Sequence, residues 1–345
     1  MQMSGNYMFR AFGYVWLKLI LLACLFSAPL AVQADLPLIA MDGKKIVTAS
    51  TVRVRSQPSL TSSVVGHVNL GTIVPASKRT KNKLKNGSFQ HYWYLIQSPT
   101  MLGWVSGRFL TDFQAVNKAK IWFALIKKRL DNPDLSFRDR VALYKFTDLV
   151  VKNSQGEKLE GAFELGKLLA LQKSFEPVNY GNHKKEPYAS WIAAHQPEKR
   201  IFLDEISGEW LVSAMDYWTL ADKYKGQASG DEIAWYAANA RLGGECEGDI
   251  ACNLEREEVT QGEYLKRYPL GRYANASLKR MSNVLEYVQS TLKEQPDYFK
   301  EASGSGKTIE SLVDIIKTTN PKLSERPKAV EQIKAIQIDF NKATQ

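Results

Sequence analysis

The chain has 345 residues, of which 44% are hydrophobic and 11% aromatic, and its formal net charge is +10. This composition excludes a largely disordered chain. The length allows two domains, or one large domain with a small module attached.

The N-terminal segment, residues 1–34, has the three-part pattern of a secretory signal peptide. Two basic residues are its only charges, and the apolar run LILLACLFSAPLAV leads to small residues before a cleavage site between Ala34 and Asp35. The pattern predicts an exported protein that is periplasmic or associated with the cell envelope. A lipoprotein attached through Cys24 is a second interpretation, because LLAC resembles a lipobox. An uncleaved anchor fits less well, since the apolar run is short for a membrane span.

Most of the positive charge falls in residues 35–113. Ten basic and three acidic residues give this segment a net charge of +7, whereas residues 114–345 carry +1. A concentrated basic field attracts polyanions. For an exported protein we expect peptidoglycan or another anionic envelope polymer as the partner, and no nucleic acid. The basic cluster over residues 78–85 is equally compatible with a solvated loop that only aids solubility.

Between residues 45 and 113, short β-branched or aromatic segments alternate with turn signals, which predicts a small β-barrel. Residues 78–88 read as a polar, basic loop that ends in the hairpin signal Asn86-Gly87. The expected strands contain Val52 and Val54, Val64 to Val68, Ile73 and Val74, Tyr92 to Ile96, and Gly103 to Val105.

The order and spacing of VRVRSQPS, VVGHVNLGTIV, YWYLI and GWVSGRFL are similar to those of the bacterial SH3 (SH3b) family. The resemblance covers about a fifth of the chain, and the long basic loop departs from the usual family pattern. It implies a five- or six-stranded barrel that often targets a larger protein to the cell wall, and it implies no catalysis.

Strand alternation suggests where a ligand could bind. Trp93 should face one side of its strand, while Tyr92 and Tyr94 face the other. The two tyrosines beside Arg53 or Arg55 would form an aromatic and cationic groove for a peptide or glycan. Further candidate contacts come from the basic cluster: Lys78, Arg79 and Lys81.

From residue 114 onwards the hydrophobic period changes from two to about 3.6, which predicts an α-helical domain over residues 114–345. Successive helix pairs favour a helical array that acts as a scaffold or binds an envelope protein. The segment EYLKRYPLGRYANASL resembles the helix–turn–helix junction of TPR-like adaptors. Irregular segments are expected at 177–199, a loop with a short helix, and at 303–308, a mobile linker containing GSGKT. Ser136 is an expected N-cap, with Asp139 three residues later. The expected helices include 210–224, 233–242 with Asp231 as its N-cap, 255–268, 274–292, 309–316 and 329–340.

Two cysteines remain after the signal segment, Cys246 and Cys252. Their spacing predicts one local disulfide in an exported protein. Closing so small a loop should stabilise the fold by about 2 kcal/mol. The spacing does not match a redox C-x-x-C pair, and no second ligand pair for zinc lies nearby.

No constellation of catalytic or metal-binding residues is evident, so we expect a non-catalytic protein without a cofactor or metal. The four histidines are scattered: His67, His91, His183 and His195. The alternative is a cell-wall hydrolase with an unrecognised helical catalytic domain, for which Asp204, Glu205 and Glu209 near Trp210 are the first candidate carboxylates. A third hypothesis is a sensor or inhibitor that modulates such a hydrolase.

Overall fold

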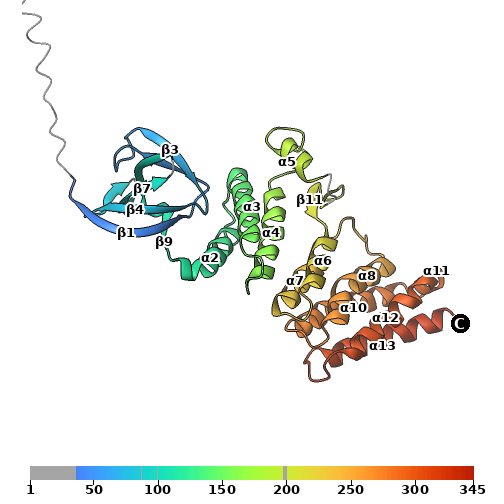
Figure 1. The fold of residues 1–345 in the computed structure, drawn as a ribbon. Coiled ribbons are helices and arrows are strands. Elements are labelled where there is room, and N and C mark those ends of the chain that lie inside the picture. Colours follow the sequence, from blue (N-terminus) through green and yellow to red (C-terminus); the bar gives the residue numbers. More distant parts are fainter. Residues whose placement is uncertain (1–35, 87, 99, 197–199) are drawn as a thin grey trace, which may run out of the picture.

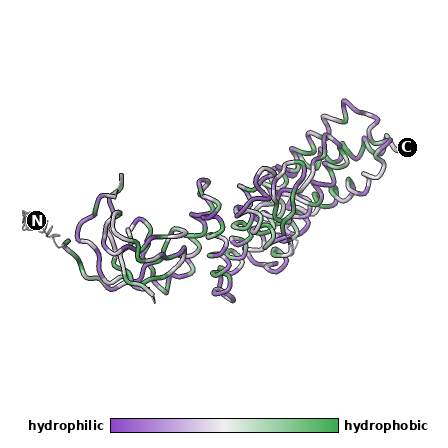
Figure 2. Tube along the Cα trace, turned by 90° about the horizontal axis from the view of Figure 1, so that it is seen from above, coloured by the Kyte–Doolittle hydropathy of each residue, from purple (hydrophilic) through white to green (hydrophobic). Residues whose placement is uncertain are grey.

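The computed structural model describes residues 36–86, 88–98, 100–196 and 200–345. The predicted signal peptide, its cleavage site at Ala34 and Asp35, and Cys24 lie outside the described residues. A strand-rich region lies at one end of the molecule, and the helices lead away from it to the C-terminus at the other end (Figures 1 and 2). No helix in the described part of the chain is long and apolar enough to span a membrane.

The strand-rich region is a curled, seven-stranded antiparallel sheet with the order β3-β2-β8-β7-β4-β1-β9. It starts at Leu38, seven residues before the predicted boundary. A separate two-stranded hairpin, β5–β6, is attached to it. The strands are β1 (Leu38–Val47), β2 (Thr51–Arg55), β3 (Val64–Asn69), β4 (Ile73–Thr80), β5 (Leu84–Asn86), β6 (Phe89–His91), β7 (Trp93–Ser98), β8 (Met101–Ser106) and β9 (Leu110–Phe113), with the short helix η1 (Gly107–Phe109) between the last two.

Alternating side chains give the sheet its core, because successive residues of a strand point to opposite faces. In β4, for example, Val74 and Ala76 are buried and their neighbours Ile73 and Pro75 are exposed. The core is small and mostly aliphatic, so it depends on valine side chains that suit strands. Its buried members are Val47, Val52, Val54, Val68, Val74, Ala76, Ile96 and Val105.

The predicted basic loop over residues 78–88 is wrong in its first part. β4 continues through Lys78 and Arg79 to Thr80, because these residues pair with β1 on one side and β7 on the other. The chain then forms the β5–β6 hairpin, in which Asn86 is opposite Phe89. That register agrees with the hairpin signal, although Gly87 itself lies outside the described residues.

The remainder is helical, as predicted. The predicted N-cap at Ser136 is confirmed, since its Oγ accepts a hydrogen bond from the backbone N–H of Asp139. The short helix inside the predicted loop is also confirmed as α5. The helices are η2 (Ala115–Asn117), α2 (Lys118–Leu130), α3 (Phe137–Lys152), α4 (Glu160–Phe175), α5 (Tyr188–His195), α6 (Ala214–Lys223), α7 (Ala228–Ala238), α8 (Ile250–Glu257), the π-helix η3 (Glu258–Gly262), α9 (Glu263–Arg267), α10 (Ala274–Glu294), α11 (Tyr298–Glu301), η4 (Ser303–Ser305), α12 (Gly306–Thr318) and α13 (Arg326–Ala343).

The helix predicted over 210–224 begins too early. A two-stranded sheet of β10 (Ile201–Asp204) and β11 (Glu209–Val212) occupies its first residues, and α6 starts only after the N-cap Ser213. The reason lies in the run Trp210 to Val212, which is buried throughout and therefore has no exposed helical face. Three consecutive buried residues suit a covered strand better than a surface helix.

Asp231 is not an N-cap, because α7 already begins at Ala228. Its carboxylate instead accepts hydrogen bonds from the Tyr264 hydroxyl (2.5 Å) and from the backbone N–H of Arg272 (2.7 Å). Asp231 therefore holds α7 to the α9–α10 junction. At that junction Tyr264 and Leu265 are fully buried, as the TPR-like resemblance implies.

Residues 303–308 are not a linker between helices. They form η4 and the first turn of α12. A Cβ atom at Gly306 would lie 2.7 Å from the Phe340 ring of α13, so glycine is needed for close packing rather than for a flexible connection.

The sheet and the first three helices share a hydrophobic core. Ile46 and Leu70 from the sheet region pack in one cluster with side chains of α2, α3 and α4, including Trp122 and Phe146. At Gly71, where φ is +80°, a Cβ atom would lie 2.2 Å from the Phe146 ring. The sheet thus has a core of its own and, beside it, a second apolar cluster that joins it to α2, α3 and α4 across residue 113.

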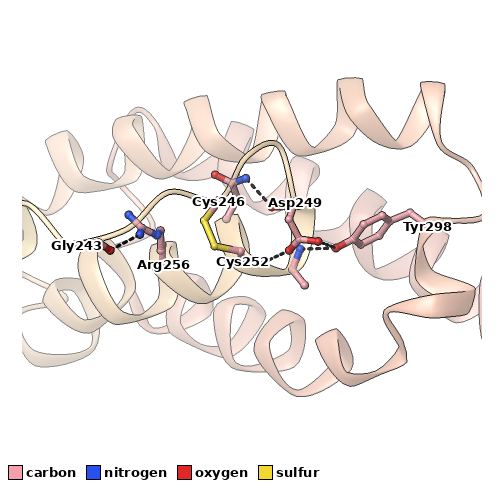
Figure 3. Close-up of a disulfide and its surroundings, with 8 residues drawn as sticks. Gly243, Cys246, Asp249, Cys252, Arg256 and Tyr298 are labelled. Atoms are coloured by element: carbon pink, nitrogen blue, oxygen red, sulfur yellow. Dashed lines mark hydrogen bonds between the residues drawn. A yellow bond between two sulfur atoms is a disulfide. The ribbon is translucent and has the colours of Figure 1, made fainter. Parts of the chain in front are cut away.

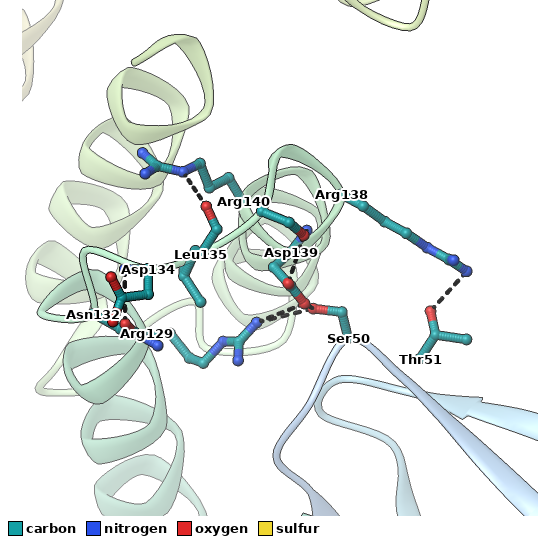
Figure 4. Close-up of polar contacts among 10 residues, drawn as sticks. Ser50, Thr51, Arg129, Asn132, Asp134, Leu135, Arg138, Asp139 and Arg140 are labelled. Atoms are coloured by element: carbon teal, nitrogen blue, oxygen red, sulfur yellow. Dashed lines mark hydrogen bonds and ion pairs between the residues drawn. The ribbon is translucent and has the colours of Figure 1, made fainter. Parts of the chain in front are cut away.

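Polar contacts seal the same junction (Figure 4). Arg129 of α2 donates to Ser50 Oγ (2.9 Å) and to Asp139 of α3 (3.2 Å), and Ser50 itself donates to Asp139. Arg138 donates to Thr51 Oγ1 at 3.1 Å. These contacts orient the sheet relative to α2 and α3.

Candidate ligand-binding face of the sheet

Cationic side chains lie over aromatic rings on the sheet region. The Arg79 guanidinium is 4.3 Å from the centre of the Tyr92 ring, and Lys83 Nζ is 5.7 Å from the same centre. The Arg108 guanidinium is 4.3 Å from the centre of the Phe89 ring. We call these five residues the cation–aromatic face.

The fold brings these residues together through β4, the β5–β6 hairpin and η1. Gly107 allows the close approach: its backbone N–H donates to the Tyr92 carbonyl at 2.8 Å, and a Cβ atom there would lie 2.7 Å from the Tyr94 ring. Arg108 follows directly, so it is held beside the corner between β6 and β7. Arg79 comes from β4, where it is opposite Tyr94 of β7.

The cations of the face lack acidic partners. In the described part of residues 36–113, the one ion pair joins Lys45 to Asp112 at 2.5 Å. Lys45 also lies 4.4 Å from the centre of the Tyr94 ring, but its charge is compensated and its side chain is 7% exposed. Arg79, Lys83 and Arg108 therefore remain available for an anion.

The structure separates some of the predicted ligand contacts. Arg53 is exposed on β2, opposite His67 of β3. Arg55 is 8% exposed, and its guanidinium donates to the Ser62 carbonyl at 2.6 Å. Strand β8 lies between β2 and β7, so the cations over Tyr92 and Tyr94 come from β1, β4 and the segment after β4 instead.

The other predicted basic contacts flank the face. Lys78 is exposed on β4, one residue before Arg79. Lys81 is exposed just beyond β4, and its backbone N–H donates to the Pro37 carbonyl at 2.8 Å. Both can add to the positive field without contacting the rings.

Sequence reasoning missed Phe89 and Arg108. Phe89 is 47% exposed, which is unusual for a phenylalanine in so small a domain. Its position directly after a hairpin signal indicated a strand that begins at the turn, and that signal could have identified it.

The carboxylates considered for catalysis have structural partners. Asp204 accepts hydrogen bonds from the Gly244 N–H (2.9 Å) and the Ser207 hydroxyl (2.6 Å). The bond from Gly244, followed by that from Ser207, lowers the pKa of Asp204, whereas a general acid needs a raised pKa. Glu209 pairs with Arg241. Glu205 is exposed in the turn between β10 and β11.

Two of the histidines lie against backbone carbonyl groups of their own segments. His195 is buried, with Nδ1 2.8 Å from the Trp191 carbonyl, and His183 Nδ1 lies 3.0 Å from the Tyr180 carbonyl. Among the described residues, no group of three histidine, cysteine or acidic side chains could hold a metal ion.

Cys246 and Cys252 form the predicted disulfide, with their Cα atoms 5.5 Å apart (Figure 3). Within the closed loop, Asp249 caps α8 by accepting from the Cys252 N–H (2.7 Å). It also accepts from the Tyr298 hydroxyl (2.7 Å), while Arg256 donates to the Gly243 carbonyl (2.6 Å). The disulfide therefore fixes the start of α8 against α11.

Comparison with known proteins agrees with the geometry of the sheet. No curated protein matched the chain. Residues 50–111 match the family model of the bacterial SH3 domain, a segment that runs from just before β2 into β9 and contains every residue of the cation–aromatic face. The resemblance drawn from the sequence is thus confirmed, and β1 and the helical region lie outside the matched segment.

Proposed function

We propose that the protein is a non-catalytic protein of the cell envelope whose bacterial SH3 domain binds an anionic wall polymer. The observation that carries the proposal is the set of three cations without acidic partners, held over the rings of Tyr92 and Phe89. Export follows from the signal-peptide pattern of residues 1–34. The helical array is the scaffold that presents the domain.

Peptidoglycan is the first candidate ligand. Its stem peptides carry carboxylates that guanidinium groups can pair with in a two-bond geometry. Its sugars offer apolar faces that can pack on the exposed part of Phe89. Bacterial SH3 domains are often associated with the cell wall, which supports the same choice.

The test is a pull-down of the mature chain on insoluble peptidoglycan at low and high salt, with the supernatant assayed for released fragments. Salt screens interactions between exposed charges, so binding should weaken at high salt. The triple variant R79Q/K83Q/R108Q should bind about tenfold more weakly, because each lost surface contact costs about 0.5 kcal/mol.

The matched control is K225Q/K322Q/K334Q, which removes the same charge from exposed lysines of the helical region. Equal loss in both triple variants would show that only net charge matters and would contradict the assignment to this face. Release of wall fragments by the wild-type chain would contradict the non-catalytic proposal and favour the hydrolase alternative.

A further inference from the structure

A second cation–aromatic arrangement lies on the helical array, far along the chain from the sheet. The Arg280 guanidinium is 5.1 Å from the centre of the Trp235 ring. Trp235 stacks on Tyr273, with ring centres 5.1 Å apart and planes inclined by 8°. The Arg272 guanidinium is 5.3 Å from the centre of the Tyr273 ring. We call these four residues the arginine ladder.

The ladder is held by two helices and a fixed junction. Trp235 is on α7, Tyr273 is the N-cap residue of α10, and Arg280 lies two turns further along α10 on the same face. The Tyr273 N–H donates to the Tyr264 hydroxyl at 3.0 Å, and that hydroxyl donates to Asp231. The backbone that carries Arg272 and Tyr273 is therefore fixed before any ligand arrives.

The two arginines of the ladder differ from the other arginines of the helical region. Within its described residues, the other eight each donate a guanidinium hydrogen bond to the protein, whereas Arg272 and Arg280 donate none. The eight are Arg129, Arg138, Arg140, Arg200, Arg241, Arg256, Arg267 and Arg326.

Nearby acidic groups form no ion pair with these two guanidinium groups within the described chain, although the charge of Arg280 acts to lower the pKa of Glu257. Both carboxylate oxygens of Asp231 already accept hydrogen bonds, from the Tyr264 hydroxyl and the Arg272 backbone N–H. Glu257 is buried behind this surface and forms no ion pair within the described chain. Both Arg272 and Arg280 are exposed, so their N–H groups face solvent.

The stack limits what can bind. Each ring already has a neighbour on its face, so a sugar or a nucleobase has little ring surface on which to stack. The N–H edges of the two guanidinium groups have no partner within the described chain. Such edges can pair with a carboxylate through two parallel hydrogen bonds. Tryptophan, tyrosine and arginine are also the side chains that contribute most to protein–protein binding energy.

We propose that the arginine ladder is a docking site for an acidic peptide segment of a partner protein, with carboxylates paired to Arg272 and Arg280. The site is independent of the SH3 domain and gives the helical array a binding role of its own. Peptide carboxylate is the proposed complement, and an anionic glycan or a nucleic acid is the alternative that the test below distinguishes.

The test uses the mature chain and a fluorescein-labelled peptide of alternating glutamate and serine, followed by fluorescence anisotropy. The same peptide with glutamine in place of glutamate is the neutral control. R272Q/R280Q should weaken binding about tenfold or more, because both charge-assisted contacts to the peptide are lost. R272K/R280K should also weaken binding, since lysine keeps the charge but loses the two-bond geometry.

Two control variants test whether the loss of peptide binding is specific to the arginine ladder. K279Q/K293Q removes two charges from exposed lysines of α10 and should bind as the wild type does. R79Q/K83Q/R108Q separates this site from the SH3 domain and should leave unchanged the part of peptide binding that R272Q/R280Q removes, even if wall binding is lost.

Unchanged binding by R272Q/R280Q would overturn the proposal, as would loss of peptide binding in the SH3 variant alone. Stronger binding of an anionic glycan or single-stranded DNA at the ladder would also overturn it, because the occupant would then be of another class. Each variant must give the circular dichroism spectrum of the wild type, which shows that it is folded. If R272Q/R280Q does not fold, R272K/R280K provides the same test.

Discussion

The sheet and the helical array use positive charge in different ways. In the described part of the sheet region only Lys45 has an acidic partner, and other cations lie over rings. In the described helices many cations are paired with carboxylates, as in the pair of Lys167 with Asp148 at 2.5 Å and that of Arg267 with Glu263 at 2.6 Å. Ion pairs between elements are therefore common in the helical region and rare in the sheet region. Among the arginines of the helices, Arg272 and Arg280 of the arginine ladder are the exceptions, because they donate no guanidinium hydrogen bond within the described chain.

The largest loss of stability is expected from a substitution at the junction between the sheet and the helical array. Gly71→Ala would combine a positive φ with a clash against Phe146, so unfolding should become easier by about 4 kcal/mol. Gly156→Ala is the matched control, because φ there is +76° but no atom lies within 4 Å of the added Cβ. The control should cost about 1 kcal/mol. Urea unfolding measures both, and equal losses would mean that Phe146 moves aside freely.

The next largest effect concerns Glu257, a carboxylate that the helices do not pair. Burial raises the pKa of Glu257 to about 7, although the charge of Arg280 acts in the opposite direction. The group should therefore stabilise the fold below pH 4.5, with that contribution lost as the pH rises to about 7.

Glu257→Gln removes this dependence. At pH 8 the variant should be more stable than the wild type by roughly 3 kcal/mol, and at pH 4 the difference should vanish. Urea unfolding at the two pH values measures the difference. A constant difference at both would show that the carboxyl ionises normally in the folded protein.

Removing the disulfide tests whether the helical array depends on this covalent constraint for its stability. C246S/C252S should lower the free energy of unfolding by about 2 kcal/mol, as expected for a short closed loop. Thermal unfolding with and without a reductant gives a direct comparison. The reductant should lower the unfolding midpoint of the wild type and leave that of the variant unchanged. Any other pattern would show that the change in stability does not come from losing this disulfide.

The smallest effect is expected at Asp139, where a carboxylate joins the two regions. Burial alone would raise its pKa, but hydrogen bonds from Ser136 and Ser50 and the charge of Arg129 together lower it. Its stabilising contribution is therefore present above the ordinary pKa of the carboxyl and is lost as the pH falls through the lowered value.

Asp139→Asn should cost about 1 kcal/mol near neutral pH and less in acid. Chemical unfolding over a pH series measures this. Asp134→Asn on the preceding loop is the control, and an equal effect there would show that the junction contacts contribute nothing specific.

Much of the fold could be predicted because it rests on local signals. The strand pattern, the N-cap at Ser136, the short helix after Pro187 and the cysteine pair are each encoded within a few residues. The strand at Trp210 was missed because three buried apolar residues fit a helix and a strand equally well until their surroundings are known.

The candidate sites were less predictable, because they depend on contacts between distant segments. Tyr92 and Arg79 were both named from the sequence, but their pairing follows from the continuation of β4. Phe89 with Arg108, and Trp235 with Arg280, are brought together by tertiary packing that no local pattern encodes. Likewise, the proximity of Arg53 to the tyrosines assumed a strand order that the sheet does not have.

The cluster that joins Ile46 and Leu70 to the first helices bears on how this module can be exchanged between proteins. Residues 50–111 alone would leave out Ile46 and the rest of β1, and Leu70 would lose its cover. A transplant to a new host would then present an apolar surface where the native chain has an interior. Ending the unit at α4 would expose a second apolar surface, because Leu168 and Leu171 of α4 are buried against the helices that follow. The sheet can therefore be moved without an exposed apolar surface only together with the helices that cover it.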